Sequence, residues 1–80
     1  MLFATPTKRS VTIAGHETSV SLEPMFWEAL DAAAREEAVP LNALIARIDA
    51  DRLTTDPPPP NLTSAVRQWL FTRALSANAS

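Results

Sequence analysis

The chain has 80 residues, of which 46% are hydrophobic, and it contains one glycine, seven prolines and no cysteine. Without cysteine it can build neither a disulfide framework nor a thiolate metal site, and no apolar run is long enough to span a membrane. The formal net charge is −2, with the acidic residues gathered in the middle of the chain, and this is not the charge of a typical nucleic-acid-binding protein.

The size of the chain favours association. A domain of this length buries roughly 60% of its unfolded surface, and a lone core rarely supplies more than about 3–5 kcal/mol. With no disulfide or metal to add stability, we expect a homodimer or a higher oligomer. The first residues, MLFATP, lack the basic start of a signal peptide, so we expect a cytoplasmic protein.

Residues 8–23 are rich in Val, Ile, Thr and Ser in alternation, which predicts strand. The apolar positions are odd at Val11 and Ile13 but even at Val20 and Leu22. A single continuous strand would therefore place these side chains on opposite faces.

A two-residue turn at Gly15-His16 resolves this conflict, because it pairs Val11 with Val20 and brings all the apolar side chains to one face. A type II′ turn requires positive φ at its first position, where the one glycine would stand. The other face of the hairpin is then polar and carries Lys8, Ser10, Thr12, Glu17, Ser19 and Ser21.

Two helices follow the hairpin. Pro24 can occupy a first turn, and residues 24–37 place Phe26, Leu30, Ala33 and Ala34 at helical spacing, with Trp27 beside this stripe. The helix stops before Val39-Pro40, because the residue before proline avoids the helical region. A second helix is predicted from Pro40 to near Arg52, with an apolar face of Leu41, Leu44, Ile45 and Ile48.

The run Pro57–Pro60 cannot be helical and favours a stiff, extended spacer. After it, Asn61 can cap a third helix, whose inward residues are Leu62, Ala65, Val66, Trp69 and Leu70. The predicted organisation is a flexible N-terminus (1–7), a main domain (8–53), a rigid proline-rich linker (54–60), a helix (61–75) that packs on the dimer, and a tail (76–80).

The segment SVSLEPMFWEALDAAAREEAVPLNALIARI, residues 19–48, resembles the ribbon-helix-helix family. The order of RSVTIAGHETSVSLEP, LNALI and NLTSAVR is similar to a largely uncharacterised bacterial subgroup of that family, and the likeness covers about residues 8–71. It implies an α+β, mostly helical fold, in which a β-ribbon precedes two helices and an extra C-terminal helix, in an intertwined homodimer.

The resemblance also implies binding of double-stranded DNA in transcription regulation. In that family a dimeric ribbon enters the major groove and the start of the second helix meets a phosphate. Carried over here, Ser19 and Ser21 would face the groove, and Leu41 and Asn42 would supply the phosphate-binding turn. The extra strand, residues 8–14, would either cover the ribbon edge or extend the sheet; it would bring Lys8, Ser10 and Thr12 to the same polar face, with Lys8 and Arg9 as candidate phosphate contacts. The chain departs from the family pattern by having serines where Arg, Lys, Asn or Gln are usual, and Pro40 where a capping Ser or Thr is usual.

The expected core and dimer contacts are Val20, Leu22, Phe26, Trp27, Leu30, Leu44, Ile45, Ile48 and Trp69. An alternative function is a protein–protein interaction or dimerisation module that keeps the fold without binding DNA. The serine-rich ribbon and the net acidity favour this alternative, and Trp27 or Trp69 would then serve as exposed anchors for the partner.

The residue pattern gives no support for catalysis. His16 is the only histidine and has no Cys or second His to complete a metal or acid–base site, unless two copies meet across a dimer. Asp49, Asp51 and Asp56 lack the glycine of a calcium loop and fit a solvated helix end. The serines lack a nucleophile elbow, and there is no phosphate loop or dinucleotide fingerprint. We therefore expect no enzyme activity, cofactor or metal.

Overall fold

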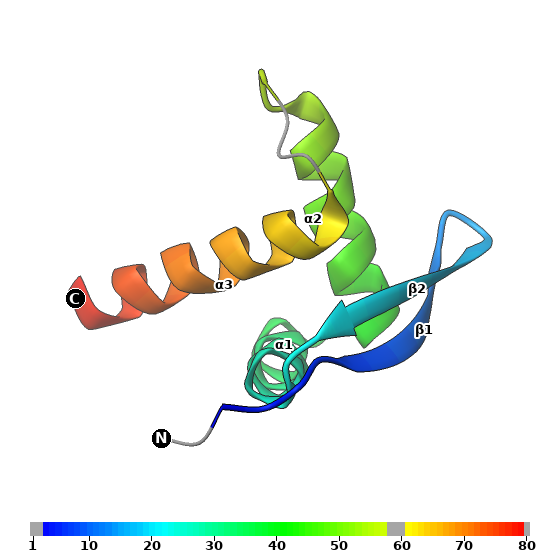
Figure 1. Ribbon diagram of the computed structural model, residues 1–80. Helices are drawn as coiled ribbons and strands as arrows, with labels where there is room; N and C mark the ends of the chain where they lie inside the picture. The colour runs from blue at the N-terminus through cyan, green and yellow to red at the C-terminus, as the bar shows by residue number, and fades with distance from the viewer. Residues whose placement is uncertain (1–2, 58–60, 80) are drawn as a thin grey trace.

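The computed structural model describes residues 3–57 and 61–79, in which a two-stranded hairpin is followed by three helices (Figure 1). The elements are β1 (Thr7–Ile13), β2 (His16–Leu22), α1 (Pro24–Glu37), α2 (Leu41–Thr54) and α3 (Leu62–Ala79). This order confirms the predicted α+β ribbon, two helices and additional C-terminal helix. Most of the predicted proline spacer, residues 58–60, lies outside the described residues.

The hairpin is antiparallel, but its turn is not the predicted one. Ile13 pairs with His16 and Ser10 with Ser19, so the turn residues are Ala14 and Gly15, with φ of 52° and 81°. Positive φ at both positions is the type I′ pattern, whose twist matches that of the strands. The predicted type II′ turn at Gly15-His16 and its register are wrong, because glycine here takes the second turn position.

The two registers differ by two residues, so the side chains keep the faces that the sequence pattern predicts. Val11, Val20 and Leu22 are buried together, and Ile13 packs at the border of the same core. The predicted separation into an apolar and a polar face is therefore confirmed.

The first helix begins and ends where the sequence predicts. Pro24 stands in its first turn, where the missing N–H costs nothing. At its end Ala38 adopts a left-handed conformation with φ of 56°, and the amides of Ala38 and Val39 donate to the carbonyls of Arg35 (3.1 Å) and Ala34 (3.0 Å). These two bonds close the helix in the manner of a Schellman motif and turn the chain into Pro40.

A single chain closes its own core. All five elements contribute buried hydrophobic residues, namely Val11, Val20, Leu22, Trp27, Leu30, Ala33, Ala34, Leu44, Ile45, Ile48, Ala65, Val66 and Leu70. Phe26 and Trp69, also predicted for the core, are half-buried and pack against it. Strand β1 and helix α3 thus cover apolar surface that β2, α1 and α2 alone would leave exposed.

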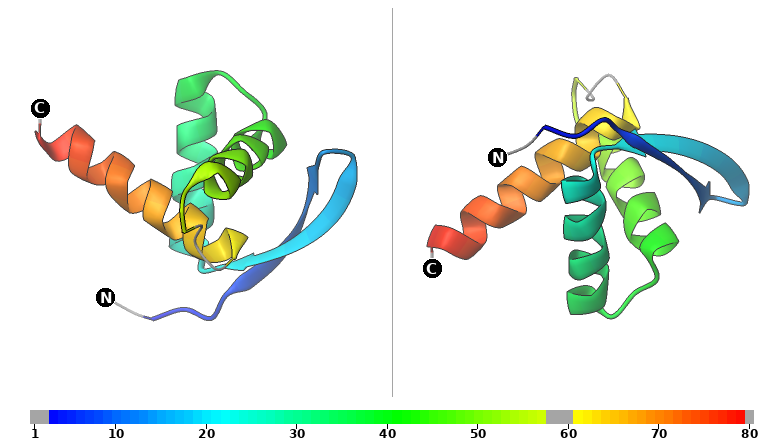
Figure 2. Two further views of the ribbon diagram at one scale, coloured as in Figure 1. Left: turned by 90° about the horizontal axis from the view of Figure 1, so that it is seen from above. Right: turned by 60° about the horizontal axis from the view of Figure 1, so that its bottom comes forward.

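The third helix starts as predicted and runs further. Asn61 caps it, since the Ser64 amide donates to Asn61 Oδ1 at 2.7 Å. It continues to Ala79, whereas residues 76–80 were expected to form a tail. The hairpin and the C-terminal half of α3 project on opposite sides of the α1–α2 pair (Figure 2). None of the three helices in the described part of the chain has the length and apolarity needed to cross a bilayer.

The left-handed Ala38 gives a test of this helix end. A non-glycine residue in this conformation costs about 1–2 kcal/mol, so Ala38→Gly should raise the free energy of unfolding by about 1 kcal/mol after the entropy of glycine is allowed for. The same substitution at exposed Ala29, inside α1, should lower it by about 1 kcal/mol. Urea denaturation measures both, and equal destabilisation by the two variants would contradict the assigned helix end.

Candidate nucleic-acid interface

One face of the hairpin is polar and exposed. The register places Lys8 opposite Ser21, Ser10 opposite Ser19, and Thr12 opposite Glu17, and side chains at these alternate positions share one face. All of them are exposed except Ser21, which is half-buried. The structure therefore brings together five of the eight residues predicted to contact DNA, together with Glu17, whose charge offsets that of Lys8.

Arg9 lies on the opposite face of the hairpin, away from the other predicted contacts. Its guanidinium stands over the Trp27 ring, 4.7 Å from the ring centroid, and 3.6 Å from the Asp31 carboxylate. The Trp27 indole N–H donates to the Thr7 carbonyl at 2.8 Å. These contacts hold β1 against α1, so the structure gives Arg9 a role in positioning the hairpin.

The start of α2 meets the hairpin through Asn42. The Thr12 amide of β1 donates to Asn42 Oδ1 at 3.2 Å, which links two parts of the predicted interface that are 30 residues apart in sequence. Pro40 occupies the N-cap position without a side-chain cap, and Leu41 is half-buried against the core. The N-terminal turn of α2 therefore lies beside the outer edge of β1.

The direction of the Thr12 amide also identifies the open edge of β2. Backbone groups along a strand alternate between the two sides. The Thr12 N–H points away from β2. The backbone N–H and C=O groups of its partner Glu17 therefore point away from β1, and so do those of Ser19 and Ser21. No described side chain caps this edge of β2 as Asn42 caps that of β1. The edge can accept another strand.

Most of the positive charge is used inside the chain. The ion-paired arginines are Arg9 with Asp31, Arg47 with Glu37, Arg52 with Asp49, Arg67 with Glu23, and Arg73 with both Glu36 and Glu37. Among the described side chains, Lys8 and Arg35 make no ion pair. Lys8 is thus the cation that the polar face of the hairpin offers to an anion.

Two arginines of α3 form ion pairs that attach this helix to the preceding elements. Arg67 donates to Glu23 at 2.7 Å, and this bond holds the pKa of the Glu23 carboxyl below its ordinary value. Arg73 donates to Glu36 at 2.6 Å and Glu37 at 3.3 Å, which raises the pKa of its guanidinium. The sequence pattern did not reveal these pairs, because the residues in each pair are 36 to 44 positions apart.

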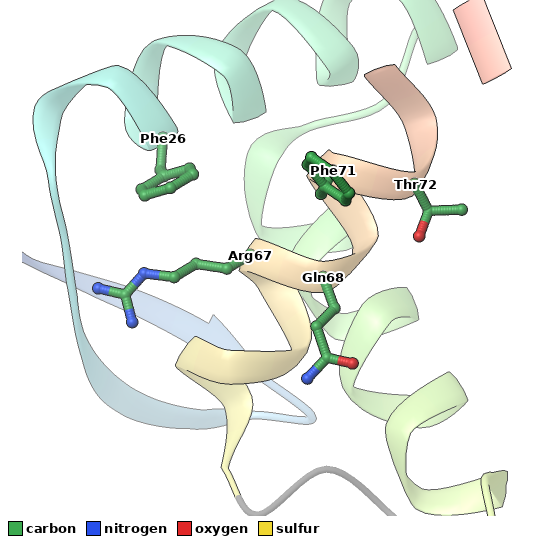
Figure 3. A pocket seen from close by; sticks show the side chains of 5 residues that line it. All are labelled: Phe26, Arg67, Gln68, Phe71 and Thr72. Carbon is green, nitrogen blue, oxygen red and sulfur yellow. The ribbon is translucent and has the colours of Figure 1, made fainter. Parts of the chain in front are cut away.

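A hollow of about 490 Å³ lies beside the first of these ion pairs. Figure 3 shows Phe26 of α1 and Phe71 of α3 facing it, with Arg67, Gln68 and Thr72 completing its lining. The Arg67 guanidinium stands 5.5 Å from the centroid of the Phe26 ring. The described residues include no cluster of metal-ligating side chains at this hollow or elsewhere.

Comparison with known proteins identifies the family. No curated protein and no solved structure gives a significant match to the chain. The model of a family described as a ribbon-helix-helix domain matches residues 6–74, which include the hairpin, α1, α2 and most of α3. Proteins with this domain are generally DNA-binding transcription regulators. The chain therefore belongs to the ribbon-helix-helix domain family.

Proposed function

We propose that this protein is a homodimeric, DNA-binding transcription regulator that inserts the polar face of its ribbon into the major groove. The observation that carries the proposal is the exposed polar face of the hairpin, on which Lys8 makes no ion pair and beside which α2 begins. A β-ribbon fits the major groove, and the free amides of a helix N-terminus bind phosphate. In this proposal Leu41 and Asn42 supply the amides, and the protein acts in the cytoplasm.

The dimer forms through the open edges of two β2 strands. The backbone groups of Glu17, Ser19 and Ser21 point outward along this edge. An antiparallel pair of β2 strands with its twofold axis at Ser19 lets all three residues form backbone hydrogen bonds with the partner strand. Glu17 then lies opposite Ser21 of the partner subunit, which avoids a contact between two carboxylates. Pairing also satisfies the backbone groups of an otherwise exposed edge.

The width of this sheet assigns different roles to its strands. Four strands in the order β1-β2-β2-β1 span about 14 Å between the outer strand axes, whereas the major groove is about 12 Å wide. The two central strands therefore face the bases with Ser19 and Ser21. The outer strands lie at the groove walls, where Lys8 meets the phosphate backbone.

The side chains on the polar face predict that the protein binds DNA but discriminates only modestly between base sequences. A good bidentate contact to a base is worth about 1–3 kcal/mol of discrimination, and Arg, Lys, Asn and Gln make such contacts. Serine has a single short hydroxyl, which both donates and accepts and so distinguishes base pairs poorly. Phosphate contacts from Lys8 and from the start of α2 then supply most of the binding free energy.

Salt dependence tests the role of Lys8. Each phosphate contact contributes about −0.9 to the slope of log K against log salt concentration, and a dimer has two copies of Lys8. Lys8→Gln should therefore make the slope shallower by about 2, as measured by fluorescence anisotropy with a labelled duplex. Arg35→Gln removes the same charge from the far end of α1 and should leave the slope unchanged.

Two results would refute DNA binding through this face. One is a wild-type protein that fails to bind duplex DNA at low salt. The other is an equal loss of slope in the Lys8→Gln and Arg35→Gln variants, which would indicate a diffuse effect of net charge.

A single introduced cysteine tests the dimer, because the chain has none of its own. At the twofold axis the two copies of residue 19 are about 5.5 Å apart between Cα atoms, within the range that a disulfide spans. Ser19→Cys should therefore form a disulfide-linked dimer under mild oxidation. Ser10→Cys lies on the same face but on β1, and it should stay monomeric on a non-reducing gel. Faster cross-linking of Ser10→Cys would contradict pairing through β2.

The second candidate function is a dimerisation or protein-interaction module without DNA binding. The near-neutral ribbon face, where Glu17 offsets Lys8, favours this candidate. The two functions separate in the experiments above. Cross-linking at residue 19 together with no DNA binding at low salt would favour the interaction module.

A further inference from the structure

The second half of α3 presents an unusual apolar surface. The buried residues of this helix, Ala65, Val66 and Leu70, all lie in its first half. Beyond them, Phe71 is 65% exposed and Leu75 is 54% exposed. Gln68, Phe71, Thr72 and Leu75 are spaced i, i+3, i+4 and i+7, so they share one side of the helix. We call these four residues the α3 seam.

The α3 seam has no charge of its own. Helix α3 contains no acidic residue, and its two arginines are ion-paired with Glu23, Glu36 and Glu37 of the same chain. An acidic peptide, a nucleic acid or an anionic lipid surface would have to break these pairs to find a cation there. The seam therefore fits an uncharged, apolar helix, and two copies of the seam meet without repulsion between like charges.

The shape of the seam favours a copy of itself. Phe71, which is largely exposed, stands at the rim of an open hollow that it lines together with Phe26, Arg67, Gln68 and Thr72 (Figure 3). A twofold contact requires that each surface carry both a projection and the recess that receives it. An antiparallel crossing of two α3 helices places each Phe71 ring at the hollow of the other copy.

We propose that the α3 seam is a self-association surface, through which α3 packs antiparallel against α3 of a second copy of this chain. This inference goes beyond the proposed function and does not depend on it. The hairpin and the C-terminal half of α3 project on opposite sides of the α1–α2 pair (Figure 2). The seam therefore has its own twofold axis, and together with the ribbon contact it assembles dimers into larger species.

The size of the surface sets the strength of the contact. A fully enclosed aromatic side chain buries about 150–250 Å², so partly covered Phe71 and Leu75 add a few hundred Å² per copy at most. A stable specific interface buries about 1,200–2,000 Å² in total. We therefore expect weak association that rises with concentration between the micromolar and millimolar ranges.

Sedimentation equilibrium of the full chain tests the seam. The wild-type mass should increase with concentration, and Phe71→Gln should raise the dissociation constant of this step about tenfold or more. Leu53→Gln is the matched control, because Leu53 is 64% exposed on α2 and lies outside the seam. Both positions are exposed, so both variants should keep the wild-type circular dichroism spectrum.

A cysteine at the seam gives a second measurement. Thr72→Cys should form an intermolecular disulfide on mild oxidation, at a rate that rises with protein concentration, whereas Leu53→Cys should react slowly. The proposal is overturned if Phe71→Gln associates as the wild type does, if Leu53→Gln lowers association equally, or if the two cysteine variants cross-link at the same rate. Loss of DNA binding or of the Ser19→Cys cross-link would leave these results unchanged, so the two proposals fail separately.

Discussion

The turn at Ala14–Gly15 fixes the pairing of β1 with β2, and the alternation of side chains along the paired strands decides which of them enter the core. In this pairing Arg9, Val11 and Ile13 fall on the face toward the helices, while Lys8, Ser10 and Thr12 face away. Trp27 then holds the hairpin in place, since its indole N–H binds the Thr7 carbonyl and its ring lies under Arg9. The polar face stays exposed because the other face packs against the helices through Val11, Val20 and Leu22.

Strand β1 and helix α3 are additions to β2, α1 and α2, and they affect which surfaces of the chain are left for a second copy. Strand β1 and helix α3 contribute Val11, Ala65, Val66 and Leu70 to the core. Val66 and Leu70 of α3 are buried with Ile45 and Leu22 in one continuous cluster. All five elements of one chain contribute to this core, and the association that we propose acts through a strand edge and a helix seam. The packing of α3 on its own chain also places Arg67 and Arg73 of α3 beside Glu23, Glu36 and Glu37, so these arginines form ion pairs within the chain.

Sequence patterns predicted what depends on local periodicity. The alternation around Val11 and Val20 separated the two faces of the hairpin, and the apolar spacing with its flanking prolines placed α1 correctly. They did not predict the turn, because a lone glycine suits either turn type and Ala14 gives no sign of positive φ. The contact of Asn42 with Thr12 also escaped prediction, since it joins residues 30 apart and depends on how whole elements pack.

The candidate site was predictable in part for the same reason. Strand parity alone groups Lys8 with Ser10 and Thr12, whereas Arg9 is predicted to join them only because it is a basic neighbour of Lys8. Its true surroundings are Trp27 and Asp31, and only the packing of β1 on α1 brings these together. The exposure of Phe71 was equally hidden, because WLF at residues 69–71 shows three apolar side chains without telling which of them faces the core.

The most direct measurement of which surface meets DNA is the change in backbone amide chemical shifts of the full chain on titration with a short duplex at low salt. We expect the largest changes in residues 8–12 and 17–21, with further changes at Leu41 and Asn42 where α2 begins. The amides of α3 around Phe71 should barely move. Changes confined to α3, or none anywhere, would contradict the proposal that the polar face of the ribbon binds DNA.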